Sequence, residues 1–251
     1  MSKRSFPNWY KIAEAALNIT PDQFQAMSFN EKLALARNRS ISPQTQLLFF
    51  TEKYEDKLNA LYQLAENKSI TPQTQLLFFT EKYKHKNYVL KYLATNTSIY
   101  PQTQLLFFTQ EYSGKIVALQ YLALNPSITP QTQLLFFTET YKQKSNILWH
   151  LAQNTSISPQ TQLLFFTQEY EEKDIILQYL AQNTNLSSQT QLLFFTQEYK
   201  EKNYVLKHLL DNPSFLKDFT TQQLREITKI KEARLLAYSK RLKQIRKKIK
   251  L

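Results

Sequence analysis

Three histidines are the side chains of this chain best suited to acid–base or metal chemistry. His150 and His208 lie 58 residues apart, twice the 29-residue repeat described below, so they occupy the same repeat position. With stacked helices about 8–10 Å apart, roughly 20 Å would separate them, which is too far for one metal ion. His85 has a different repeat position, and any Ser–His–Asp candidates fall on surface positions of copied segments. The chain therefore predicts no catalytic residue and no metal site.

Cysteine and glycine usage narrows the chemistry further. The chain has no cysteine, which excludes disulfides, thiolate metal sites, iron–sulfur clusters and cysteine nucleophiles. Its single glycine, Gly114, cannot supply a glycine-rich phosphate-binding loop. We expect a protein without a cofactor that acts by binding and not as an enzyme.

Aromatic side chains and histidines recur at positions that differ between copies of the repeat. Counted from the first residue of each copy, positions 17, 21 and 24 share one face of a predicted helix, and Trp149 lies next to this face. The candidate binding residues are Tyr88, Tyr92, Tyr121, Trp149, His150, Tyr179, Tyr204 and His208. Large amphipathic rings are typical of recognition surfaces, which favours a protein partner. Free drift at solvent positions after duplication is the alternative explanation.

The positive charge is concentrated near the C-terminus. Residues 217–251 hold twelve Lys and Arg against three Asp and Glu, a net +9, which leaves 20 against 17, or +3, for residues 1–216. A stripe from Leu235 to Ile249 follows helical spacing. The basic residues around it are Lys240, Arg241, Lys243, Arg246, Lys247, Lys248 and Lys250. This segment is either a helical cap with its charges in water, or a site for nucleic acid, an anionic membrane surface or a partner helix.

A repeated nonapeptide organises the elements that must position these residues. The sequence Pro-Gln-Thr-Gln-Leu-Leu-Phe-Phe-Thr begins at Pro43 and recurs every 29 residues, with serine in place of proline in the sixth copy, at Ser188. A fixed period of this length is typical of a solenoid, in which each copy buries its apolar face against its neighbours. We therefore predict six repeats over residues 43–216.

Each copy predicts two helices. A serine or threonine followed by proline is a helix start, so the first helix of the second copy should run from about Pro72 to Tyr83. Its four consecutive apolar residues predict burial on nearly all sides. A second helix should follow over about Asn87 to Thr95, with one apolar stripe. A buried strand is the alternative for the first element, but the Ser/Thr-Pro start favours helix.

Three polar residue types recur at the 29-residue period. The asparagines are Asn38, Asn67, Asn96, Asn125, Asn154, Asn183 and Asn212. We interpret them as helix-ending residues in the left-handed conformation that brace the following turn, in preference to a catalytic or ligand-binding row. The tyrosines and lysines are Tyr54, Tyr83, Tyr112, Tyr141, Tyr170 and Tyr199, and Lys57, Lys86, Lys115, Lys144, Lys173 and Lys202. Half-buried rings and cations at the carbonyl end of the first helix are the expected roles, and a phosphate-binding stripe of lysines is the alternative.

The remaining segments are expected to close the array. Residues 1–42 predict a degenerate N-terminal cap, in which Ser28 and Glu31 have the spacing of a capping box and a short helix follows as far as Asn38. Residues 217–251 predict the C-terminal basic helix. No apolar run approaches the roughly 18 residues of a membrane-spanning helix, and no signal core is visible. We expect a cytoplasmic protein.

A family resemblance appears in the link between copies. The segment Leu33-Ala34-Leu35-Ala36-Arg37-Asn38-Arg39-Ser40-Ile41-Ser42-Pro43, echoed from Tyr121 to Pro130, resembles the bacterial leucine-rich repeat variant family. The resemblance covers about residues 30–216 and implies an all-helical, right-handed superhelix with a short first helix, in part 3₁₀, that serves as a scaffold. This chain has a longer repeat and lacks the cysteine cluster of some members, so no iron–sulfur role carries over.

Together these features predict an all-α solenoid that binds another macromolecule through the varying face of its second helices, and they favour a protein as the partner. A nucleic-acid-associated protein using the basic C-terminal tail is the second hypothesis, and an enzyme of unknown type is the third.

Overall fold

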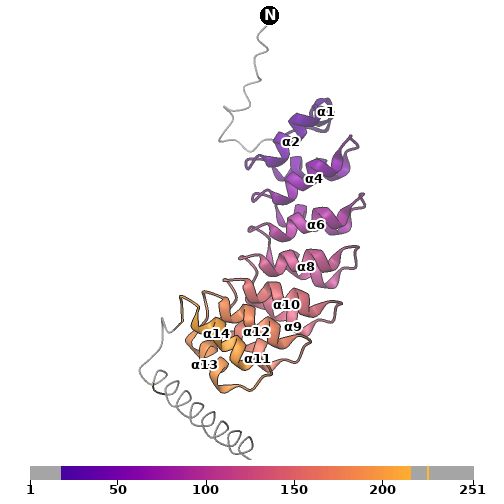
Figure 1. The fold of residues 1–251 in the computed structure, drawn as a ribbon. Coiled ribbons are helices and arrows are strands. Elements are labelled where there is room, and N and C mark those ends of the chain that lie inside the picture. Colours follow the sequence, from indigo (N-terminus) through magenta and orange to yellow (C-terminus); the bar gives the residue numbers. More distant parts are fainter. Residues whose placement is uncertain (1–17, 216–224, 226–251) are drawn as a thin grey trace, which may run out of the picture. The chain divides into compact units, whose positions relative to one another are not determined.

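The computed structural model describes residues 18–215 and residue 225 (Figure 1). These residues contain fourteen α-helices and no strand, which confirms the all-helical repeat and excludes the strand alternative for the first element. Residues 1–17 and the predicted basic segment from Lys240 to Lys250 lie outside the described residues. Within the described part, no helix has both the length and the apolar character needed to cross a bilayer.

The chain divides into two compact units, residues 1–143 and 144–251. The helices of the first unit are α1 (Pro21–Ala26), α2 (Phe29–Arg37), α3 (Pro43–Thr51), α4 (Lys57–Glu66), α5 (Pro72–Thr80), α6 (Lys86–Thr95), α7 (Pro101–Thr109), α8 (Lys115–Leu124) and α9 (Pro130–Thr138). Those of the second are α10 (Lys144–Gln153), α11 (Pro159–Thr167), α12 (Lys173–Gln182), α13 (Ser188–Thr196) and α14 (Lys202–Leu210).

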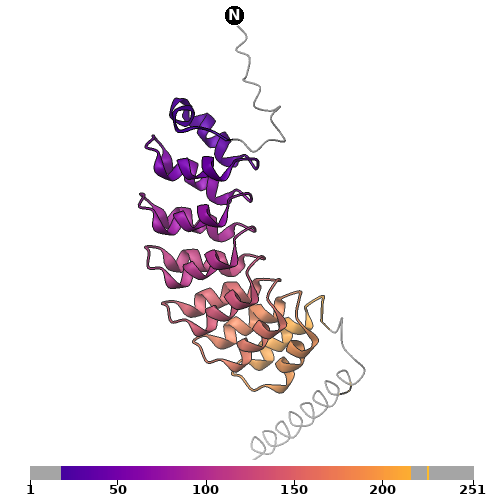
Figure 2. The ribbon, with the colours of Figure 1, turned by 180° about the vertical axis from the view of Figure 1, so that it is seen from behind.

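Helices of the same kind stack on one another within each unit. In the first unit α2, α4, α6 and α8 pack each against the next, and α3, α5, α7 and α9 form a parallel row (Figures 1 and 2). In the second unit α10, α12 and α14 form one row, and α11 packs against α13. Each copy therefore buries its apolar side chains against its neighbours, as expected for a solenoid.

The helix starts follow the sequence signals. The hydroxyl of Thr71 accepts a hydrogen bond from the backbone N–H of Thr74 at 3.2 Å, and Pro72 takes the first helical position. The first helix ends at Thr80, three residues before the predicted end, because the backbone turns extended at Glu81. Its partner begins at Lys86 and ends at Thr95, within one residue of the prediction.

The N-terminal pair α1 and α2 is a shortened copy. The capping box is confirmed, since the Ser28 hydroxyl and the Glu31 carboxylate each accept from the other residue's backbone N–H. Phe24 packs edge-on against Phe49 at a ring distance of 5.1 Å. This contact corresponds to the one between Phe50 and the next copy's first phenylalanine, at 4.9 Å. The pair thus covers the apolar end of the first full copy.

The left-handed conformation predicted for the asparagines is wrong. Asn67 ends α4 with φ −70° and ψ 120°, which is extended. In the first five copies the left-handed residue is instead position 14, immediately before the second helix, whereas Glu201 of the sixth copy has φ −92°. The left-handed residues are Asp56, His85, Gly114, Gln143 and Glu172, with φ between 52° and 75°. In the third copy a Cβ at Gly114 would lie 2.8 Å from the Cβ of Asn87. The only glycine of the chain therefore occupies a turn whose positive φ and close neighbour suit a residue without a Cβ.

Phenylalanines and aliphatic residues form the core. In the first unit Phe79 packs edge-on against Phe107 at 4.9 Å, and Phe108 packs against Phe136 at the same distance. The predicted stripe of the second helix is confirmed. Its members Val89, Leu90, Leu93 and Ala94 are all fully buried.

The prediction that the first helix is buried on nearly all sides is wrong. Phe78 is fully buried, but Leu76 in the same helix is 44% exposed and Leu77 is half-buried. With only two layers of helices, the first helix contacts its own row and its second helix, and its remaining side faces solvent. Of the leucine pair, Leu76 therefore lies at the surface and Leu77 lies at the edge of the core.

Two rows of buried amides connect consecutive copies. The Asn96 side-chain N–H₂ donates to the carbonyls of Ala65 (2.7 Å) and Asn67 (3.0 Å), and its Oδ1 accepts from the Ser98 N–H. Gln104 bridges in the same way, with an amide N–H₂ that donates to Ser127 O and an Oε1 that accepts from Thr129 N and Thr132 Oγ1. No buried side-chain nitrogen or oxygen of the described residues is left without a partner. These amides fix the register between copies.

Candidate binding face on the second helices

The predicted binding residues lie on the solvent-facing side of the second helices, where Tyr88 and Tyr204 are exposed and the other six are half-buried. We call positions 17, 20, 21 and 24 of the copies the variable face. Its outermost members are positions 17 and 24, which are exposed in all six copies. Position 17 is Asn59, Tyr88, Val117, Asn146, Ile175 and Tyr204, and position 24 is Glu66, Thr95, Leu124, Gln153, Gln182 and Asp211. Tyr88 is 54% exposed and Tyr204 is 52% exposed.

The exposed side of the first helices behaves differently. Positions 2 and 9 of each copy are also exposed, but they do not vary. Position 2 is Gln44, Gln73, Gln102, Gln131, Gln160 and Gln189, and position 9 is Thr51, Thr80, Thr109, Thr138, Thr167 and Thr196. The same 29-residue copies thus carry one constant and one variable exposed side.

Rings of neighbouring copies touch along the variable face of the first unit. Tyr62 lies 4.9 Å from Tyr92, ring to ring. Lys91 Nζ lies 5.8 Å from the Tyr92 ring and 4.5 Å from the Tyr121 ring. Its hydrogen bond with Tyr121 raises the pKa of Lys91, which stays charged. The structure therefore brings Tyr92 and Tyr121 together through Lys91, and it adds Tyr62.

The second unit repeats this arrangement with different side chains. Trp149 packs edge-on against Tyr179 at 5.0 Å and lies 4.4 Å from the ring of His150. Burial lowers the pKa of His150. The ring of His208 is 4.9 Å from that of Tyr204. All the predicted residues of this unit fall in two neighbouring clusters.

The sequence reasoning missed one recurring contact between copies. Position 20 of one copy meets position 21 of the next, thirty residues on, in the pairs Tyr62 with Tyr92, Lys91 with Tyr121, and Trp149 with Tyr179. Periodicity places both positions on the same helix side, but the stagger between stacked helices is needed to see that they touch. Tyr62 and Lys91 join the candidate face for this reason.

A basic pocket lies at the N-terminal end of the variable face. Its lining residues are Arg37, Arg39, Gln63, Glu66, Asn67 and Lys68. Arg37 Nε donates to Gln63 Oε1 at 2.6 Å, so the C-terminal end of α2 touches position 21 of α4. Sequence reasoning did not identify this pocket, because Arg37 and Lys68 are 31 residues apart in sequence.

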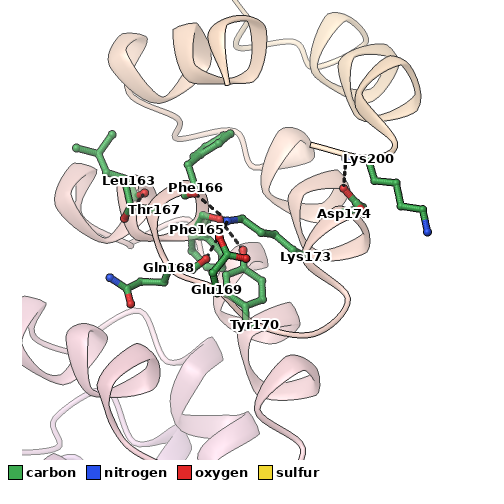
Figure 3. Close-up of polar contacts among 10 residues, drawn as sticks. All are labelled: Leu163, Phe165, Phe166, Thr167, Gln168, Glu169, Tyr170, Lys173, Asp174 and Lys200. Atoms are coloured by element: carbon green, nitrogen blue, oxygen red, sulfur yellow. Dashed lines mark hydrogen bonds and ion pairs between the residues drawn. The ribbon is translucent and has the colours of Figure 1, made fainter. Parts of the chain in front are cut away.

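The lysine and tyrosine rows are structural. Lys173 Nζ donates to the carbonyls of Phe166 (2.8 Å) and Gln168 (2.9 Å) at the end of α11, and it pairs with Glu169 at 3.2 Å (Figure 3). The hydroxyl of Tyr170 donates to the carbonyl of Phe165 at 2.7 Å. Lys57 and Lys86 make the corresponding bonds in the first unit. These cations satisfy helix carbonyls, which favours the expected structural role over a phosphate-binding stripe.

The described residues define a helical repeat protein whose two exposed sides differ in sequence variability. Among them, no group of three or more His, Cys, Asp or Glu side chains is placed to hold a metal ion. A comparison with protein-family models, curated proteins and solved structures finds no match for this chain. The resemblance to leucine-rich repeat variants stays a prediction.

Proposed function

We propose that this protein is a non-enzymatic scaffold that binds another protein through the variable face. One observation carries the proposal: exposed positions 17 and 24 differ between copies, whereas exposed positions 2 and 9 are identical in all six. Both sets belong to the same copies and have the same duplication history. The threonine of position 9 donates to the carbonyl four residues earlier in every copy, which gives it a structural reason to stay constant. The glutamine of position 2 is the informative case, because free drift after duplication would change it as readily as positions 17 and 24.

The side chains of the variable face suit a protein partner. Tyr88, Val117, Ile175 and Tyr204 are all more than 40% exposed. Exposed rings and aliphatic side chains beside polar residues are typical of protein interfaces. Residues 1–216 carry a net charge of only +3, and lysines of the structural row are engaged by helix carbonyls. A phosphate backbone would find few cations along the repeats.

The proposal is tested by removing the exposed apolar residues of one position. The face variant carries Tyr88→Ser, Val117→Ser, Ile175→Ser and Tyr204→Ser. The matched control carries four exposed substitutions in the same copies, Gln73→Ser, Gln102→Ser, Gln160→Ser and Gln189→Ser. Full-length proteins are used for affinity purification from the native cell, with and without nuclease, and the bound proteins are quantified by mass spectrometry.

A specific set of proteins should bind the wild type and the control but not the face variant, whether or not nuclease is added. Equal binding by all three proteins would contradict the proposal. Loss in the control alone would assign binding to the first helices. Loss on nuclease treatment would favour the second hypothesis, association with nucleic acid.

A further inference from the structure

The basic pocket at the N-terminal end of the variable face has no counterpart in the later copies. We propose that Arg37, Arg39 and Lys68 bind carboxylates of an acidic peptide segment of the partner, and that apolar side chains of the same segment pack on Tyr62, Tyr88 and Tyr92. This inference rests on the proposed function, because it names the chemistry of the partner.

The pocket combines three cations, one of which is held in place by a hydrogen bond. Arg37 is exposed and its Nε is fixed by Gln63 Oε1 at 2.6 Å, which leaves the other guanidinium N–H groups for an incoming acceptor. Arg39 and Lys68 occupy the same turn position, 26, in adjacent copies. Three cations around a pocket with one carboxylate, Glu66, form a site with net positive charge. Arginine suits bidentate binding of carboxylates.

The later copies test the alternative explanation that these cations only stabilise the end of a helix. Cations near a helix C-terminus stabilise the helix dipole and need no ligand. Every second helix has such an end, yet later copies place other side chains there. At positions 24 and 26 they have Thr95 and Thr97, Leu124 and Pro126, Gln153 and Thr155, Gln182 and Thr184, and Asp211 and Pro213. Helix stabilisation alone would not confine the cations to the first copies.

The pocket is continuous with the aromatic part of the face. Gln63, which holds Arg37, occupies the same position 21 as Tyr92 in the next copy, and its neighbour Tyr62 touches Tyr92 at 4.9 Å. Tyr88 precedes Tyr92 by one helical turn and is 54% exposed. A bound segment can therefore place an acidic residue in the pocket and apolar residues on the rings, one or two copies along.

Charge placement favours an acidic peptide over a nucleic acid strand. A strand carries a phosphate at every nucleotide and needs cations along its whole path. Beyond the pocket, the variable face of α4, α6 and α8 offers only Lys91, which is engaged by Tyr121. Glu66 would also repel a dense polyanion. A peptide with carboxylates at one end and apolar residues at the other fits this distribution.

The test uses peptides of defined sequence. Random dodecapeptides displayed on phage are selected on the full-length protein, and the most enriched peptide is synthesised with a fluorescein label. Its dissociation constant is measured by fluorescence anisotropy on the wild type and on two triple variants. The pocket variant is Arg37→Gln, Arg39→Gln and Lys68→Gln. The control removes three exposed lysines from the far loops of the same part of the array, Lys53→Gln, Lys82→Gln and Lys84→Gln. Helical content is checked by circular dichroism.

We expect enriched peptides that contain Asp or Glu next to apolar residues. Losing several charged contacts should weaken their binding about tenfold or more in the pocket variant, and much less in the control. Binding to the wild type should weaken with added salt.

Four results overturn the inference. Enriched peptides without acidic residues, or equal binding by the pocket variant, refute the acidic partner but leave the proposed function standing if the serine face variant loses binding. Binding of a labelled oligothymidylate in place of peptides, lost in the pocket variant, refutes both. Failure to enrich any peptide, together with unchanged partners of the face variant, also refutes both.

Discussion

The first and second helices of each copy recur with the same period, but their exposed sides differ in how much they vary. The exposed side of the first helix keeps glutamine at position 2 and threonine at position 9 in every copy, whereas the exposed side of the second helix changes at positions 17 and 24. Their buried sides do not differ in this way, since Phe78 and Leu90 are both fully buried and recur as the same types. Copying therefore preserves the stack and the exposed side of the first helix, whereas the exposed side of the second helix and the loop between the two helices have diverged.

The bonds that hold the stack together also explain why positions 17 and 24 can diverge. Register between copies is fixed by buried amides such as Asn96 and Gln104, which bond to the neighbouring copy's backbone. None of these bonds involves position 17 or 24. Side chains at positions 17 and 24 can therefore change without disturbing these bonds.

The largest effect is expected in the constant part. Phe108 is 6% exposed and packs against Phe136 at 4.9 Å and Tyr141 at 6.5 Å. Phe108→Ala should lower the free energy of unfolding by about 3–5 kcal/mol, because it leaves a cavity between two copies. Chemical denaturation measures the loss, with Gln102→Ala on the same helix as the control. A loss below about 1 kcal/mol would mean that the phenylalanine does not hold the copies together.

The next effect concerns the amide row. Asn96→Ala removes donors to two backbone carbonyls and the acceptor of the Ser98 N–H, and each buried group left unpaired costs about 1–3 kcal/mol. We expect a net loss of about 2–3 kcal/mol in denaturation. The neighbouring exposed Thr95→Ala is the control. If both substitutions cost the same, the asparagine would only end its helix, and the register would depend on packing alone.

The sequence predicted this architecture unevenly. Local signals sufficed for the helix starts at Thr71-Pro72 and for the capping box at Ser28, because these depend on residues a few positions apart. They failed where the partner lies in another copy. Residue type alone predicts left-handed turns at the asparagines, but an amide such as that of Asn96 bonds carbonyls 29 and 31 residues earlier, in the preceding copy. The basic pocket and the contact of Tyr62 with Tyr92 depend on the stagger between stacked helices, which period alone does not specify.

A third prediction uses alkaline pH to separate structural tyrosines from those of the face. Burial raises the pKa of Tyr54, Tyr83, Tyr112, Tyr141 and Tyr170 well above its usual value near 10. The folded state keeps these protons longer than the unfolded state, so their contribution to stability is complete below about pH 10 and is lost as the pH rises further.

Two lysines have the opposite effect on how stability changes with pH. Burial lowers the pKa of Lys57 and Lys86, so the folded state releases those protons first and stability gains as the pH approaches 10. The tyrosines outnumber them, and we expect net destabilisation above about pH 10. Melting temperatures across this range should fall less steeply for Tyr83→Phe than for wild type, with the exposed Tyr88→Phe as the control. Identical slopes for the two variants would refute the structural role of Tyr83.

The smallest effect tests the comparison itself, within one copy. Gln73 and Tyr88 are exposed on the first and second helix of the second copy, and substitutions at exposed sites usually change stability by less than about 0.5 kcal/mol. Gln73→Ala and Tyr88→Ala should both stay within that limit in chemical denaturation, while only Tyr88→Ala weakens partner binding. A destabilisation above about 1 kcal/mol by Gln73→Ala would have a specific meaning. The glutamine would then be required for stability, which would by itself explain why it is identical in six copies. The contrast between the two exposed sides would no longer indicate that the variable face is selected for binding.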